Sequence, residues 1–218
     1  MLPRLVLPAT LLTIGLLVSP VHADPIYFTI DHCAVGDCTA FDQSGRGAIV
    51  AELDVINGND LLITLSNALN ASAAGDMPHL TNIGFAYGGL LQGLTFDSFT
   101  VLSGAAARPS ITVDRAIHSF SLDFGLAFPD DRNRENWFQA GSRNEIVQVV
   151  IGTTGDLNLS QFLLGVAKVG GAGLNGRGGS VTLTGTQARY ASVPEPASLA
   201  FVGLGITILG LRRRTRSR

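Results

Sequence analysis

Positive charge is scarce in most of this 218-residue chain. Residues 24–193 hold nine basic side chains against sixteen acidic ones, so their formal charge is −7, and Lys168 is their single lysine. Proteins that bind nucleic acid or anionic lipid neutralise phosphates with clustered lysine and arginine, and this part of the sequence shows no such cluster. We therefore expect the body of the protein to have no nucleic-acid partner.

Signatures of catalysis are also missing. The sequence contains no G-x-S-x-G motif of the kind that carries a nucleophilic serine. Residues 171–176 match G-x-G-x-x-G, but further glycines follow where a helix should begin, which is typical of a loop. We expect a protein that is not an enzyme. A secreted hydrolase stays open as the second alternative, because the spacing of carboxylates in a sequence does not reveal their separation in space.

Long apolar runs occur only at the two ends of the chain. Residues 1–23 contain one basic residue, Arg4, an apolar stretch from Leu5 to Val18, and a small-residue ending at Ala23. This pattern predicts a signal peptide that the Sec translocon exports and that signal peptidase cuts after Ala23. The alternative is a permanent N-terminal anchor.

The second apolar run covers about residues 197–211, and arginines follow it directly. As a helix, fifteen residues extend about 22 Å, which crosses the hydrocarbon core of a bilayer only with snorkelling arginines or local thinning. Arginines on the cytoplasmic side would leave the body on the far side of the membrane. We expect an intermediate anchored in the inner membrane, with residues 24–190 on the side away from the cytoplasm. We expect these residues to form a single domain.

The body has the period of two that β-strands show. Apolar and polar side chains alternate along residues 26–30, 120–124 and 181–184, and further strands are expected at 48–56, 61–65, 82–87, 94–101, 111–113, 145–151 and 162–169. Asn57-Gly58 predicts a hairpin turn, and a helical turn is expected after Asp156. Many short strands with glycine-rich connections predict an all-β fold, an antiparallel β-sandwich of jelly-roll type.

Only two cysteines, Cys33 and Cys38, are present, in the segment DHCAVGDC. In an exported protein an even count at close spacing indicates a disulfide. A metal site that adds His32 and Asp37 is the alternative, but zinc sites usually need a second, distant pair of ligands.

An acidic segment, residues 129–136, starts like a calcium loop at Asp131. It is not an EF-hand, because the sixth position is Asn136 instead of glycine and the twelfth is Ser142 instead of glutamate. Two interpretations stay open: a solvated loop, or an irregular calcium site, the one cofactor we consider, at Asp130, Asp131, Asn133 and Glu135.

The single tryptophan, Trp137, follows the acidic segment. Saccharide-binding modules stack sugar rings on exposed aromatic side chains, so Trp137 and Tyr87 are the candidates for glycan stacking. A tryptophan that anchors the core is the other interpretation.

The C-terminal segment, residues 191–218, has three parts in order. Pro194-Glu195-Pro196 precedes the Gly- and Leu-rich apolar span, and Arg212, Arg213 and Arg214 follow it. The two prolines cannot extend a helix and hold the chain extended beside the bilayer. This order resembles the PEP-CTERM protein-sorting domain of Gram-negative bacteria.

The resemblance implies a partner and a destination. In that family exosortase, a membrane enzyme, removes the tail near the Pro-Glu-Pro motif, and the body reaches the cell surface or the medium. It implies a surface or matrix protein associated with exopolysaccharide or biofilm, and since the body shows no catalytic motif we expect its role to be non-catalytic. A carbohydrate-binding β-sandwich with a calcium-organised loop is the first alternative.

Overall fold

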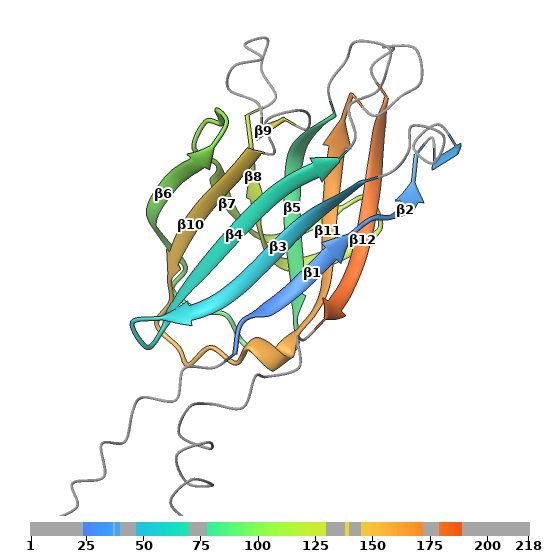
Figure 1. Ribbon diagram of the computed structural model, residues 1–218. Coiled ribbons are helices and arrows are strands. Elements are labelled where there is room, and N and C mark those ends of the chain that lie inside the picture. Colours follow the sequence, from blue (N-terminus) through green and yellow to red (C-terminus); the bar gives the residue numbers. More distant parts are fainter. Residues whose placement is uncertain are drawn as a thin grey trace, which may run out of the picture.

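The computed structural model describes residues 24–36, 38–39, 47–69, 78–129, 138–139, 145–171 and 179–188. These residues form antiparallel β-strands with a 3₁₀ turn at Leu159–Gln161, so the all-β prediction is confirmed (Figure 1). The strands are β1 (Ile26–Ile30), β2 (His32–Val35), β3 (Gly47–Ile56), β4 (Asp60–Leu69), β5 (His79–Tyr87), β6 (Thr95–Ser103), β7 (Ser110–Ile117), β8 (Phe120–Ala127), β9 (Phe138–Gln139), β10 (Glu145–Gly152), β11 (Phe162–Gly170) and β12 (Ser180–Ala188).

Every strand expected from the sequence is present, although most run further than the alternation indicated. The predicted bounds of β1 are correct to the residue, and the 3₁₀ turn lies where a helical turn was expected. The sequence analysis missed β2 and β9, which have four and two residues. Strands this short carry too few alternating positions for a period to be visible.

The strands form one curled sheet with two halves that face each other. The hydrogen-bonded order is β6-β10-β4-β3-β1-β12-β11-β5-β8-β7, with β2 beside β12 and β9 beside β5. We call β6 to β1 the first half and β12 to β7 the second half; Figure 1 shows the first half in front. The halves join where β1 pairs with β12. The predicted sandwich is therefore present as a half-barrel, with successive strands such as β4 and β5 passing from one half to the other.

One core fills the space between the two halves. Phe28 of β1 meets Phe85 of β5 across this space, with ring centroids 5.4 Å apart. Phe85 also contacts Phe124 and Phe162, so four aromatic rings from different strands form the centre. Inward positions along β3, β4 and β10 are buried, as the period of two requires.

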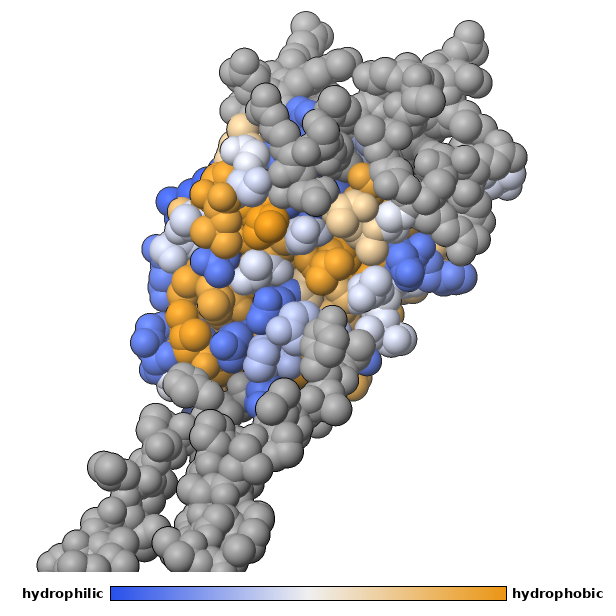
Figure 2. All heavy atoms as spheres, in the orientation of Figure 1, coloured by the Kyte–Doolittle hydropathy of each residue, from blue (hydrophilic) through white to orange (hydrophobic). Residues whose placement is uncertain are grey.

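The outer face of the first half mixes polar and apolar side chains (Figure 2). A polar row crosses it: the hydroxyl of Tyr27 donates to Glu52 at 2.9 Å, and the amide of Gln148 donates to the hydroxyl of Thr64 at 3.2 Å. Cross-strand pairs of this kind stabilise a sheet face that is open to water.

The β3–β4 hairpin confirms the predicted turn. Asn57 and Gly58 both have positive φ, at 51° and 91°. Ile56 pairs with Asp60, so the connection has three residues. Asparagine and glycine are the residues that adopt positive φ most readily, which is why the sequence signal was reliable here.

Both ends of the described body lie together. Tyr27 near its start pairs with Ala188 at its end, so the preceding and following segments leave from neighbouring points. The opposite end carries the start of β5, the end of β11 and β9 (Figure 1). Among the described residues, no helix is long and apolar enough to cross a membrane.

Candidate functional sites

The sorting signal predicted from the sequence lies beyond the described residues. Pro194, Glu195 and Pro196, like the arginines at 212–214, belong to the segment after Ala188. The chain enters this C-terminal segment from the end of β12, which lies directly beside the start of β1.

The predicted disulfide between Cys33 and Cys38 is confirmed, with the two Cα atoms 5.5 Å apart. Cys33 lies on β2 and pairs with Leu183 of β12, so the bridge closes a loop at the edge of the second half. Both sulfurs are used in the bond and are not available as thiolate ligands. Within the described residues, no group of three or more His, Cys, Asp or Glu side chains could hold a metal ion.

Tyr87, one of the two candidates for glycan stacking, lies in the core. Its side chain is 6% exposed and its ring packs on Phe162, with centroids 4.7 Å apart. The hydroxyl oxygen accepts the backbone N–H of Asn158 at 3.2 Å. A sugar ring has no access to this aromatic face, which leaves Trp137 as the candidate.

Trp137 and the four proposed calcium ligands, Asp130, Asp131, Asn133 and Glu135, lie outside the described residues, but their flanks are firmly held. Phe128 and Phe138 stack at a centroid distance of 5.2 Å, which closes the base of the segment between them. The buried amide of Asn67 donates to the carbonyl of Phe138 at 3.0 Å. The carboxylate of Glu145 accepts the N–H of Gln139 and, at 3.2 Å, that of Ala105. The residues that follow the acidic segment are thus held by β4 through Asn67 and by β10 through Glu145.

A second candidate site arises where the β7–β8 hairpin folds over the outer face of the second half. Ile117 and Leu122 of the hairpin pack on Val166 of β11 and are buried there. Leu122 can approach closely because residue 84, beneath it on β5, is glycine; a Cβ there would lie 2.6 Å from a Leu122 methyl carbon. At the tip, Nδ1 of His118 lies 2.6 Å from the hydroxyl of Thr182 on β12. The hairpin therefore covers β5 and β11 and reaches β12.

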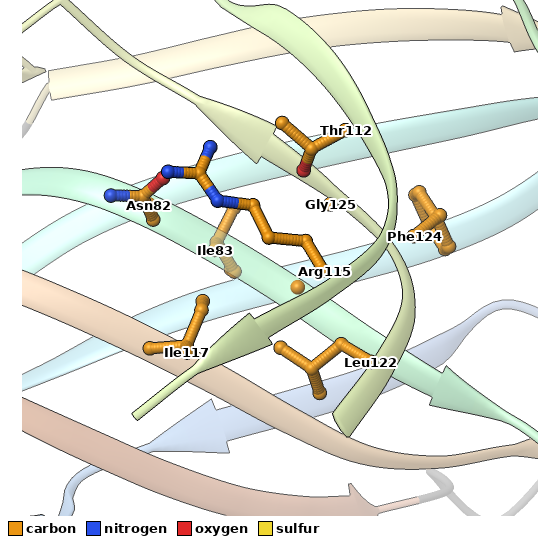
Figure 3. Close-up of a pocket in the computed structure, with 9 residues that line it drawn as sticks. Asn82, Ile83, Thr112, Arg115, Ile117, Leu122, Phe124 and Gly125 are labelled. Atoms are coloured by element: carbon orange, nitrogen blue, oxygen red, sulfur yellow. The ribbon is translucent and has the colours of Figure 1, made fainter. Parts of the chain in front are cut away.

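The space under this hairpin is closed at one end and hollow at the other. Thr112, Arg115 and Leu122 surround a gap of only about 10 Å³ against β5, where packing is tight (Figure 3). Beside it a hollow of about 250 Å³ opens to solvent. We call this the cationic hollow; it is lined by Asn82, Arg115, Ala116, Ile117, His118 and Lys168.

Sequence reasoning did not find the cationic hollow. Its residues come from β5, β7 and β11, which are separated by many residues in the chain, and the tip of the hairpin adds His118. One signal was available: Lys168 is the single lysine of a body with formal charge −7, and it occupies an outward position on an otherwise apolar strand. An outward lysine on an apolar strand of an acidic body is the signal that the sequence offered for an anion-binding site.

The fold defines an all-β protein with a disulfide at one edge and a cationic hollow on its outer face. Residues 192–216 match the family model of the PEP-CTERM protein-sorting motif, which confirms the resemblance seen in the sequence. The motif implies export and sorting to the cell surface, with exosortase as the processing partner. No curated protein and no solved structure matches the chain.

Proposed function

We propose that this chain is an exported surface or matrix protein whose body is a non-catalytic interaction module that works beside exopolysaccharide. The match of residues 192–216 to the sorting motif carries the proposal. On this proposal the signal peptide and the C-terminal apolar segment guide the chain to the membrane, and the body, residues 24–190, is the part that acts outside.

The arrangement of the two ends of the body supports this proposal. Because Tyr27 pairs with Ala188, the segment before the body and the sorting tail leave from the same end. A body held at that end presents its opposite end to the surroundings. The flanks of the acidic segment, Phe128 and Phe138, lie at that opposite end, where β9 pairs with the start of β5.

The hydrogen bonds that the polar side chains of the body make support a non-catalytic role. Glu145 accepts backbone N–H groups from two segments, and Asp123 accepts the backbone N–H of Tyr87 at 2.6 Å. His118 is held by Thr182. These side chains hold the framework together through hydrogen bonds to backbone groups and to a buried hydroxyl.

A carbohydrate-binding module with a calcium-organised loop is the second candidate. The stacked rings of Phe128 and Phe138 favour it, because they hold the base of residues 130–137 in one place. A rigid base lowers the conformational entropy that a loop loses when it orders around an ion or a sugar. On this alternative Trp137 is the stacking residue.

The intact mass of the protein recovered from the surface and medium of its host tests the main proposal. We expect a mass that lacks residues 1–23 and the segment after the Pro-Glu-Pro motif. A Glu195→Ala variant should accumulate with its tail in the membrane fraction, whereas Asp156→Ala, an exposed loop change, should be processed like the wild type. Recovery of a wild-type surface form that retains Arg218 would contradict processing by exosortase.

A binding and turnover panel then separates the candidates for the body. Retention on a glycan column that weakens after Trp137→Ala or with chelator supports the carbohydrate-binding module. Turnover of a glycan that one carboxylate substitution abolishes supports a hydrolase. If neither is observed, the non-catalytic interaction module stands.

A further inference from the structure

We infer that the cationic hollow binds the carboxylate of an acidic sugar, that is, a uronic acid unit. The inference adds a ligand class to the proposed interaction module and rests on that proposal for its biological setting.

Two cationic side chains line the hollow, although the body has few basic residues. Lys168 and Asn82 are cross-strand partners on β11 and β5, so their side chains leave the sheet side by side. Arg115 comes from the hairpin that lies over them, and its side chain extends over β5 beside Asn82 (Figure 3). Two cations therefore face one space although the body as a whole is acidic.

No carboxylate of the described residues neutralises these cations. Neither Arg115 nor Lys168 has an ion pair within that part of the chain. The two acidic side chains of the hairpin, Asp114 and Asp123, do not line the hollow, and Asp123 is held by the N–H of Tyr87. Cations brought together without a counter-charge repel each other, so an anion that enters between them gains their attraction.

The donors in the hollow suit a planar oxyanion. The guanidinium of Arg115 presents paired N–H donors that match a carboxylate in a bidentate arrangement, and the ammonium of Lys168 adds a point charge. The amide of Asn82 can donate to or accept from a neighbouring hydroxyl. Nδ1 of His118 is engaged by Thr182, so Nε2 is the ring nitrogen that remains for a ligand.

The size of the hollow favours a sugar over a free inorganic ion. Its volume of about 250 Å³ is below that of pockets for drug-sized molecules, roughly 300–1,000 Å³, and fits one sugar ring. The hollow is open to solvent, so the neighbouring units of a polymer can extend out of it. Lys168 lies two residues before the end of β11, toward the end of the body that faces away from the sorting tail.

The test measures binding of galacturonate oligomers to the full-length chain in mild detergent, by calorimetry at low salt. Arg115→Gln and Lys168→Met should each weaken binding about tenfold or more, because each removes a charged hydrogen-bond partner. Lys168→Arg keeps the charge and should retain binding. Arg108→Gln is the matched control: it removes an exposed arginine that lies over Phe96 on the other half. Thermal melting checks that each variant is folded.

Several results would overturn the inference. Absence of wild-type binding, or equal loss in Arg108→Gln, would mean that the hollow is not the site. Equal binding of neutral glucose oligomers, or equal competition by inorganic phosphate, would mean that the ligand class is wrong. None of these results affects the mass and location of the processed protein, so failure of this inference is distinguishable from failure of the sorting proposal.

Discussion

Nδ1 of His118 lies 2.6 Å from the hydroxyl oxygen of Thr182, and this contact joins the tip of the β7–β8 hairpin to β12. The two residues are 64 positions apart in the chain. Thr182 is fully buried, whereas His118 is exposed and has a positive φ of 52°. The tip of the hairpin thus covers the buried hydroxyl of Thr182 with a polar partner, His118. The cationic hollow lies beneath the same hairpin.

His118→Gly should lower the free energy of unfolding by about 1–3 kcal/mol, because it removes the partner of a buried hydroxyl. Glycine is the appropriate replacement, since it adopts the positive φ of this position without strain. Thr182→Val should cost less, because the exposed imidazole left behind can bind water. Urea denaturation of both single variants and the double variant measures the coupling. Losses that simply add would show that the contact contributes nothing to stability.

Loss of the Cys33–Cys38 bridge should destabilise the body modestly. The bridge closes a short loop, and the chain-entropy model assigns such a loop about 2 kcal/mol. Thermal melting with and without reductant, and of a Cys33→Ser/Cys38→Ser variant, measures the effect. Reductant should leave the melting temperature of the double variant unchanged, and an unchanged melting temperature in the wild type would contradict the prediction.

Gly185→Ala should damage the junction between the two halves of the sheet. A Cβ at residue 185 would lie 2.8 Å from the Cα of Ile30 and closer still to the carbonyl oxygen of Thr29, so backbone would have to move. Overpacking of this kind costs about 1–3 kcal/mol. Gly155→Ala is the matched control, because a Cβ there meets nothing within 4 Å. Equal stability of the two variants would mean that β1 can move away from β12 without cost.

Calcium should change the fluorescence of Trp137 if the acidic segment binds the ion. Trp137 is the only tryptophan, so the emission reports on one position next to the predicted ligands. Extracellular calcium modules are half-saturated at about 0.1–1 mM, which sets the range of the titration. Asp131→Asn should abolish the response, and Asp97→Asn on β6 should not. A wild-type emission that is constant over this range would favour the solvated loop.

Local patterns accounted for most of the strands but not for the site. Alternation located β1 correctly because its inward side chains, Phe28 and Ile30, are buried in the core and its outward ones are not. The same alternation along 120–124 puts Leu122 in one apolar row with Phe124, whose ring lies in the core. Leu122 is instead buried under the hairpin on the outer face, against Val166. Periodicity indicates that a residue is buried, but it does not indicate which part of the chain buries it.

The sequence by itself determined the sorting motif, the disulfide pair, the β class and the turn at Asn57-Gly58. Each of these depends on neighbours within a short stretch: a motif read in order, two cysteines five positions apart, alternation, or the positive φ of two adjacent residues. Only the tertiary structure decided that Tyr87 lies in the core, that both ends of the body meet, and that Arg115 and Lys168 line one hollow. These relations join residues that are distant in the chain, and they arise from the register of the sheet and the folding of one hairpin over its outer face.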